Sequence, residues 1–316
     1  MDLKKNIAII IQARLSSKRL PKKVLKKIYK NFTSLDILIK RLKRSKNCKN
    51  IIFAIPKKDK NSSLEKKISE YNLDIFYGSE KNVLARYYFA AKKYKLKNII
   101  RITSDCPIID YNLLDKMIQK FFLGNYDYLS NTIFPTYPDG TDVEIFKFST
   151  LEKSYKETKN SYDCEHVTPY IKRSIKFKKF NYKNEKNLSD LRVTLDTKKD
   201  LYNIRKIIDY FKDIYFNLKK IENLPPNILH KIKSPRVNNF ISREEKSWIE
   251  AKEFIPDGNN FLSKRPELFS TNKWPIYYSK AKGCIIWDQN KNKYIDLSLM
   301  GVGTNILGYS NTNINK

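Results

Sequence analysis

The sequence predicts an α/β protein, a three-layer sandwich in which helices cover both faces of a largely parallel sheet. The segment Asn6 to Ala13 is short and almost entirely apolar, as expected of a strand buried on both faces. Further short β-rich segments follow, and segments with apolar residues at helical spacing separate them. Such alternation implies right-handed crossovers and a ligand site built from loops at the carboxyl ends of the strands.

Each later element is predicted from its own pattern. The expected strands are Asn50 to Pro56, Leu73 to Tyr77, Asn98 to Thr103, Tyr126 to Asn131, Val143 to Phe148 and Leu191 to Leu195. Helical spacing occurs among Leu35, Leu38, Ile39 and Leu42, and among Leu113, Leu114, Met117, Ile118, Phe121 and Phe122. Ser62 with Glu65 predicts a capping box at the start of another helix.

The character of the sequence changes near residue 225. Pro225, Pro226 and Pro235 predict a linker, and Ser242 with Glu245 predicts the cap of a helix running to about Phe254. Of the eight glycines, three precede residue 250 and five follow it. We therefore divide the chain into a first domain over residues 1–224, a linker and helix over 225–254, and a small, incomplete α+β segment over 255–316.

Composition excludes several classes of protein. The chain of 316 residues is 41% hydrophobic, which is too apolar for a disordered polyelectrolyte. Its longest apolar run, Ile7 to Ile11, is too short for a membrane helix, so no membrane association is expected. Four separated cysteines without a CxxC motif predict reduced thiols in a cytoplasmic protein.

The net charge of +30 raises the question whether the chain binds nucleic acid. Such a charge is typical of nucleic-acid binders. Here, however, the excess is almost all Lys, spread along the whole chain in short runs instead of clustered on one element. We do not expect nucleic acid as a partner; if it were one, binding would depend steeply on salt and show no nucleotide preference.

The first expected strand leads into a cationic loop, Ala13 to Leu25. A nucleoside triphosphate needs several fixed cations, and Arg14, Arg19 and Lys23 could supply them. Neither a Walker loop nor GxGxxG is present, so ordinary P-loop and dinucleotide-binding proteins lose their main support. A solvated basic loop without a ligand is the alternative in a chain this rich in Lys.

Five motifs occur in order over about residues 6 to 215. They are Ala13-Arg14-Leu15-Ser16-Ser17-Lys18-Arg19-Leu20-Pro21-Lys22-Lys23, then Arg101 to Pro107, Pro138 to Glu144, Glu165 to Tyr170 and Leu191 to Thr197. On these residues the chain resembles the CMP-sugar-activating cytidylyltransferases, which include acylneuraminate cytidylyltransferase, CMP-Kdo synthetase and spore-coat polysaccharide biosynthesis proteins. The resemblance implies a Rossmann-like sandwich of the nucleotide-diphosphosugar transferase type, often dimeric. In that family a sugar hydroxyl attacks the α-phosphorus of CTP and expels pyrophosphate.

The resemblance and the positions of the residues suggest roles. Catalysis is expected from Arg14, Lys23 and Asp105, and nucleotide binding from Ala13, Arg14, Ser17, Arg19, Lys23, Arg101 and Ser104. Sugar binding is expected from Asp139, Asp142, Glu144 and His166, and Mg²⁺ binding from Asp105 and Asp196. Both of these aspartates follow expected strands, and Mg²⁺ prefers carboxylate, phosphate and water oxygens.

Structural alternatives stay open for these residues. Asp105 and Asp196 could each be a helix N-cap. Pro138-Asp139-Gly140 could simply form a turn with exposed carboxylates beyond it, and His166 could cap local structure. Lys22 and Ser104 replace glycines usual in the family, which alters how closely the backbone can approach phosphate. Cys164 stands before Glu165, where the family usually has Arg.

Two other functions are possible for a chain of this kind. A glycosyltransferase of similar fold would usually show an Asp-x-Asp metal motif after a strand, and the sequence has no convincing one. A non-catalytic interaction module derived from the enzyme would fit the replaced glycines.

The stretch from Phe261 to Tyr309 resembles the start of class III, PLP-dependent aminotransferases of the glutamate-1-semialdehyde type. The residues that carry this resemblance are Gly283 to Asp288, Lys293 to Leu297, Gly301 to Gly303 and Leu307 to Tyr309. In that family the Schiff-base lysine and the domain that binds PLP come much later in the chain. We therefore expect a truncated aminotransferase segment with neither PLP nor aminotransferase activity.

Overall fold

The structure, a computed structural model, describes residues 6–234, 248, 251, 255, 277–289, 291–296, 307–312 and 314. The chain divides into two compact units, Met1–Val237 and Asn238–Lys316. Of the helix expected from Ser242 to Phe254, only Trp248 and Ala251 are described, and both are helical. The expected motif Gly301 to Gly303 lies outside the described residues.

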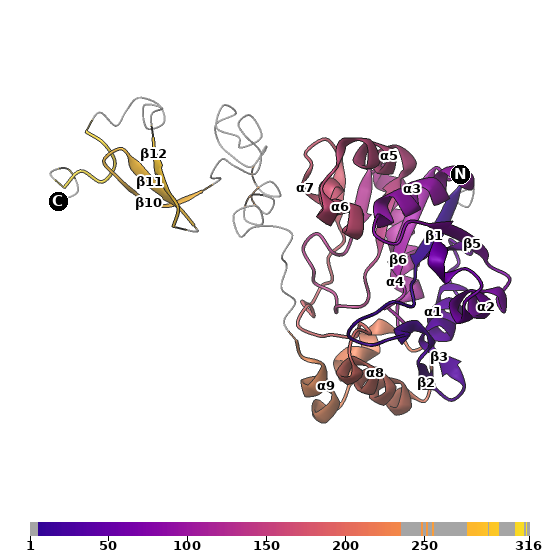
Figure 1. Cartoon of the computed structure of the whole chain (residues 1–316). Coiled ribbons are helices and arrows are strands. Elements are labelled where there is room, and N and C mark those ends of the chain that lie inside the picture. The colour runs from indigo at the N-terminus through magenta and orange to yellow at the C-terminus, as the bar shows by residue number, and fades with distance from the viewer. Residues whose placement is uncertain are drawn as a thin grey trace. The chain divides into compact units, whose positions relative to one another are not determined.

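Strands and helices alternate along the first unit (Figure 1). The strands are β1 (Ile7–Gln12), β2 (Lys27–Tyr29), β3 (Phe32–Thr33), β4 (Ile51–Pro56), β5 (Asp74–Gly78), β6 (Asn98–Thr103), β7 (Tyr128–Ser130), β8 (Glu144–Lys147) and β9 (Lys179–Asn181). The α-helices are α1 (Ser34–Leu42), α2 (Ser63–Ser69), α3 (Val83–Lys93), α4 (Tyr111–Gly124), α5 (Phe148–Glu157), α6 (Ser161–His166), α7 (Pro169–Arg173), α8 (Lys198–Phe211) and α9 (Pro226–Ile232). Short 3-10 turns are η1 (Lys23–Leu25), η2 (Lys57–Asp59) and η3 (Leu218–Asn223).

Seven of these strands form one sheet in the order β5-β4-β1-β6-β8-β7-β9. β5, β4, β1 and β6 are mutually parallel, and β9 is parallel to β7. β8 is antiparallel to both of its neighbours, so it alone runs against the others. This parallel-dominated mixed sheet confirms the predicted α/β class. The carboxyl ends of β1, β4, β5 and β6 therefore meet at one edge, where β8 begins.

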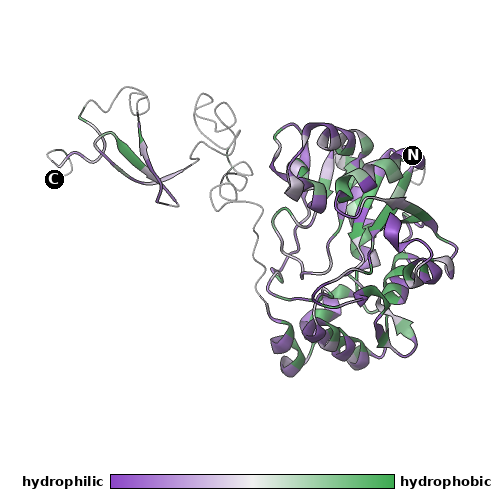
Figure 2. Cartoon of the chain, in the orientation of Figure 1, coloured by the Kyte–Doolittle hydropathy of each residue, from purple (hydrophilic) through white to green (hydrophobic). Residues whose placement is uncertain are grey.

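Both faces of the sheet are covered, because every residue of β4 and the first five residues of β1 are buried. Ile9 and Ile11 belong to the core cluster that includes Leu38 of α1. The other face meets α3, where the Tyr87 hydroxyl donates to the Ile10 carbonyl at 3.1 Å. Figure 2 shows the corresponding pattern, with apolar strands inside and polar residues on the outer faces of the helices.

The prediction of a strand over Leu191 to Leu195 is wrong. This segment forms only isolated bridges, which join Arg192 to Asp139 and Leu191 to Lys233. Its backbone bonds instead to loops, since Asp139 N–H donates to the Leu191 carbonyl and Leu195 N–H donates to the Asp105 carbonyl, both at 2.8 Å. The apolar residues fill the core without a sheet ladder, which is why their pattern resembles that of a strand.

The structure differs from the sequence-based expectations in two smaller ways. β9 (Lys179–Asn181) was not predicted, because three residues carry too little pattern. The capping box at Ser62 is only half formed: Ser62 accepts from Glu65 N–H, but the Glu65 carboxylate accepts from Asn61 N–H and not from the cap.

The described part of the second unit contains a three-stranded antiparallel sheet of β10 (Tyr278–Lys282), β11 (Ile285–Asp288) and β12 (Lys293–Ile295). Asp288 is buried and accepts hydrogen bonds from Asn292 and from the Tyr294 hydroxyl. In neither unit do the described residues include a helix that combines the length and the apolar character needed to cross a membrane.

Candidate active site

The loop after β1 is tied down at several points. Leu15 N–H donates to Asp59 at 3.1 Å, and the Ser16 hydroxyl donates to Glu80 at 2.7 Å. The Ser17 hydroxyl accepts from a backbone N–H within the same loop. These bonds link the loop to the segments that follow β4 and β5, so its cations are presented from a braced backbone.

Lys22, near the end of this loop, has a backbone conformation that is unusual for a residue with a side chain. Lys22 has φ of 52°, in the left-handed region that glycine adopts most easily. It is the residue immediately before η1, the turn that begins with Lys23. Lys22 therefore holds a conformation that favours glycine, at a cost of about 1–2 kcal/mol.

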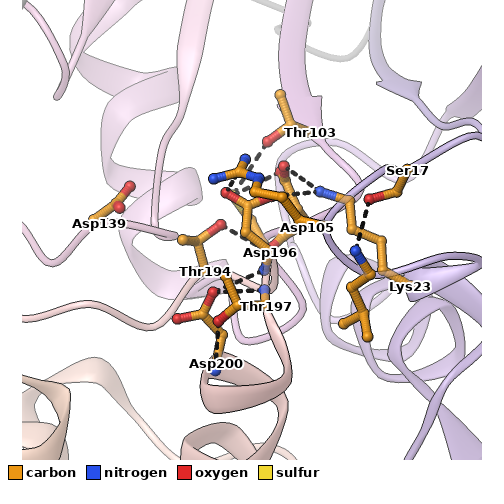
Figure 3. Close-up of polar contacts among 12 residues, drawn as sticks. Ser17, Lys23, Thr103, Asp105, Asp139, Thr194, Asp196, Thr197 and Asp200 are labelled. Atoms are coloured by element: carbon orange, nitrogen blue, oxygen red, sulfur yellow. Dashed lines mark hydrogen bonds and ion pairs between the residues drawn. The ribbon is translucent and has the colours of Figure 1, made fainter.

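Lys23 joins the two carboxylates expected to hold metal (Figure 3). Its Nζ lies 2.9 Å from Asp105 Oδ2 and 2.8 Å from Asp196 Oδ1. The Lys23 side chain is 13% exposed, so this contact is largely screened from water. The structure thus brings together three residues that are 82 and 173 positions apart in sequence.

The electrostatics of this group follow from its geometry. Burial alone would lower the pKa of Lys23, but the charges and hydrogen bonds of Asp105 and Asp196 outweigh burial and raise it. For Asp105, burial alone would raise the pKa, but the Lys23 ammonium and a hydrogen bond from Thr103 hold it below its usual value. Both partners are therefore held in their charged forms.

The other oxygen of Asp196 is bound from a second side. Asp196 Oδ2 lies 3.0 Å from the Arg19 guanidinium and 3.2 Å from that of Arg192. Arg192 also contacts Asp139 at 2.6 Å and Asp200 at 3.0 Å. Arg192 was not among the predicted site residues, although it stands inside the motif Leu191 to Thr197, where an arginine among many lysines was the available signal.

The aspartates are not helix caps. α8 is capped by Thr197, which forms a capping box with Asp200, and Asp196 precedes that cap. α4 is capped by Asp110, so Asp105 begins no helix. Both carboxylates are left to face the loop cations.

Asp139 lies in a turn that is pressed against the segment after β9. Gly140 has φ of 102°, and a Cβ there would lie 2.4 Å from the Thr194 backbone nitrogen. The turn alternative is thus correct for the backbone. The Asp139 side chain is nevertheless fixed, by its ion pair with Arg192.

Glu144 and Arg101 form a buried ion pair at the edge of the sheet, between β8 and β6. Glu144 also accepts from Tyr128 at 2.6 Å and Thr168 at 2.7 Å, and Lys172 Nζ lies 3.3 Å away. Lys172 was not predicted, because nothing distinguishes it in sequence from the other lysines. This cluster lies among the predicted nucleotide- and sugar-binding residues, but its members bind one another.

The remaining predicted residues lie on several loops. Arg14 is exposed, Ala13 is buried, and Ser104 is buried with its N–H bonded to the Gln12 carbonyl at 3.2 Å. Asp142 is half-buried just before β8.

His166 ends α6 and packs against the Tyr162 ring with centroids 4.5 Å apart. After it, Val167 has φ of 73° and ψ of −55°, and Thr168 N–H bonds to the His166 carbonyl at 2.9 Å, a γ-turn of the rare, strained kind. Burial lowers the pKa of His166, which favours the neutral imidazole.

The donor set fits Mg²⁺. No group of three or more His, Cys, Asp or Glu side chains suited to a metal occurs in the described part of the chain. Mg²⁺, however, typically takes one or two protein carboxylates and completes its shell with phosphate oxygens and water. Asp105 and Asp196 supply two carboxylates that already converge on one cation.

A parallel-dominated sheet with loop cations and paired carboxylates at its carboxyl edge is an arrangement suited to binding a nucleoside triphosphate with a divalent cation. Among known families, the cytidylyltransferase model matches residues 8–250, and the chain belongs to this family. It is 36% identical over 250 residues to the uncharacterized protein MJ1063 of Methanocaldococcus jannaschii, covering 77% of this chain and 98% of that protein.

Two further relatives carry more informative names. The spore coat polysaccharide biosynthesis protein SpsF of Bacillus subtilis is 32% identical over 208 residues, which cover 62% of this chain and 83% of SpsF. A cytidylyltransferase structure from Leptospira borgpetersenii superposes with a TM-score of 0.69 at 32% identity, covering 73% of this chain and 98% of the other.

Proposed function

We propose that the chain transfers CMP from CTP to a hydroxyl of a sugar or sugar acid and releases pyrophosphate, in the synthesis of a surface polysaccharide. The observation that carries this proposal is the convergence of Arg19 and Lys23 on Asp105 and Asp196 at the carboxyl edge of the sheet. Membership of the cytidylyltransferase family supports the nucleotide, and the name of the Bacillus subtilis relative supports the biosynthetic context.

In this proposal the loop after β1 binds the triphosphate. Arg14, Arg19 and Lys23 neutralise phosphate charge, and the bracing of the loop keeps them in place. Asp105 and Asp196 would hold Mg²⁺, which when bound neutralises charge on the departing pyrophosphate. No covalent intermediate is required, because positioning and electrostatic stabilisation suffice for in-line transfer.

The acceptor would lie beside Asp139, Asp142 and His166, at the loops next to β8. A neutral His166 can accept a proton or a hydrogen bond from a sugar hydroxyl. Glu144 is only 2% exposed, so we assign it a positioning role. It acts through Thr168 and Arg101 and does not contact the sugar directly.

The test is pyrophosphate release from CTP and Mg²⁺ with a panel of sugar acids and neutral sugars. We expect release with at least one acceptor and its loss in Arg14→Ala and Asp105→Asn. Lys26→Met is the matched control, because Lys26 is an exposed residue next to the same loop and its removal takes away one charge. Activity that survives in Asp105→Asn would refute the proposed site.

For residues 255–316 we propose an aminotransferase-like segment without activity. Its support is the motif Gly283 to Asp288, which forms β11 and the turn before it. Addition of PLP should leave the absorption spectrum of the cofactor and the melting temperature of the protein unchanged. A new protein-bound absorption band would contradict this.

A further inference from the structure

Lys23 fills the space between the two carboxylates that fit a divalent cation. Its Nζ is within 2.9 Å of one oxygen from each of them. An ammonium at hydrogen-bond distance from both oxygens occupies the place of a metal ion and repels it. Metal and Lys23 therefore compete for the same two oxygens.

Both aspartates are anchored by contacts that do not involve Lys23. Asp196 is held through its second oxygen by Arg19 and Arg192, and its own N–H donates to Asp200 at 3.0 Å. The carbonyl of Asp105 accepts from Leu195 N–H at 2.8 Å and from the Thr194 hydroxyl at 3.1 Å, two contacts made by the same segment that carries Asp196.

Lys23, by contrast, extends a flexible four-carbon side chain from a short turn. Figure 3 shows this side chain extending toward the two aspartates from a different segment of the chain. Of the three groups, the lysine is the one that can leave while the other two stay in place.

From this arrangement we propose that, in the nucleotide-free protein, the Lys23 ammonium lies between Asp105 and Asp196 and holds the two carboxylates together. When a triphosphate binds, Lys23 moves away from the carboxylates and a metal ion takes its place. The inference rests on the proposed function, since the triphosphate supplies the anion that Lys23 contacts after it moves. Metal binding is tight only in the fraction of molecules from which Lys23 has left, so its apparent affinity without nucleotide is reduced by that fraction.

Nucleotide and metal are thereby coupled. A triphosphate attracts Lys23 away from the carboxylates and so raises metal affinity. By thermodynamic reciprocity, metal raises nucleotide affinity by the same factor. Before substrate binds, the Lys23 ammonium also reduces the repulsion between the two carboxylates.

The test measures Mn²⁺ binding to the full chain, without nucleotide and with a non-hydrolysable CTP analogue. The electron paramagnetic resonance signal of free Mn²⁺ reports how much Mn²⁺ is bound. Without nucleotide, Lys23→Met should bind Mn²⁺ more tightly than wild type, by about tenfold or more. Lys26→Met, which removes a neighbouring exposed charge, should match wild type. The analogue should tighten Mn²⁺ binding by a larger factor in wild type than in Lys23→Met, because only wild type also gains from the departure of Lys23. Asp105→Asn in the Lys23→Met background should abolish the gain.

Folding of each variant is checked by circular dichroism, and Lys23→Gln serves as a second neutral variant if Lys23→Met does not fold. Equal Mn²⁺ affinity in wild type and a folded neutral variant would overturn the inference. Failure of the proposed function looks different, because wild type would then release no pyrophosphate with any acceptor while the Mn²⁺ comparison could still be made.

Discussion

The buried carboxylate Glu144 offers a quantitative test of the structure. It accepts from Tyr128 and Thr168 and faces the cations Arg101 and Lys172. The substitution Glu144→Gln keeps the shape of the side chain but removes the negative charge that pairs with Arg101 and Lys172. Breaking a buried ion pair from one side costs about 3–5 kcal/mol. For a unit of this size the melting temperature should fall by roughly 6–20 °C.

The same variant has a predicted pH signature. Burial alone would raise the pKa of Glu144, but the charges of Lys172 and Arg101 outweigh it and hold the pKa well below its usual range. A lowered folded-state pKa means that this stabilisation is present above the unfolded pKa of about 4.3 and is lost as pH falls toward the folded value. The difference in the free energy of unfolding between wild type and Glu144→Gln should therefore decrease below pH 4.3, by about 1.4 kcal/mol per pH unit.

Urea unfolding of both proteins at pH 7 and at about pH 3 measures this gap directly, with an expected narrowing of about 1.8 kcal/mol between the two conditions. Glu152→Gln is the matched control. Glu152 is more exposed than Glu144, and it pairs with Lys156, which like Glu152 belongs to α5. It should cost less than about 1 kcal/mol. A Glu144→Gln variant as stable as that control, or a gap that does not depend on pH, would refute the reasoning.

Three further changes have defined outcomes. Gly140→Ala should destabilise the protein by about 1–3 kcal/mol in urea unfolding, because φ is positive and the new Cβ meets the Thr194 backbone; an unchanged midpoint would contradict this contact. Arg41→Met should cost at least about 3 kcal/mol by the same measurement, because three buried backbone carbonyls lose their donor; a smaller loss would mean that water replaces the guanidinium. Arg192→Met should raise the half-saturating concentration of CTP with Mg²⁺ by about tenfold, because Asp196 loses a charged anchor; unchanged saturation would remove Arg192 from the site.

The sheet could be predicted where local pattern and tertiary role agree. The strands near Asn6 to Ala13 and Asn98 to Thr103 are short segments rich in Ile, and the structure forms them with nearly those bounds. Leu191 to Leu195 is also short and rich in apolar and β-branched residues, but it forms no ladder, since its backbone bonds to loops around Asp105 and Asp139. A sequence shows that such residues are buried, but it does not show which backbone groups they meet.

The site could be predicted in part for the same reason. Lys23, Asp105 and Asp196 stand in motifs directly after expected elements, and the structure brings them together. Arg192 and Lys172 act through contacts with residues far from them in sequence, and nothing local distinguishes Lys172 among 63 Lys and Arg residues. Their roles follow only from the folded arrangement.

The most direct test of the proposed site is isothermal titration of the full chain with CTP, UTP, GTP and ATP, each with and without Mg²⁺, repeated on Asp105→Asn. The proposed function predicts that only CTP, among the four nucleotides, binds tightly. This binding should depend on Mg²⁺ and be lost in Asp105→Asn. Equal binding of all four nucleotides, or CTP binding that is unchanged in the variant, would contradict it.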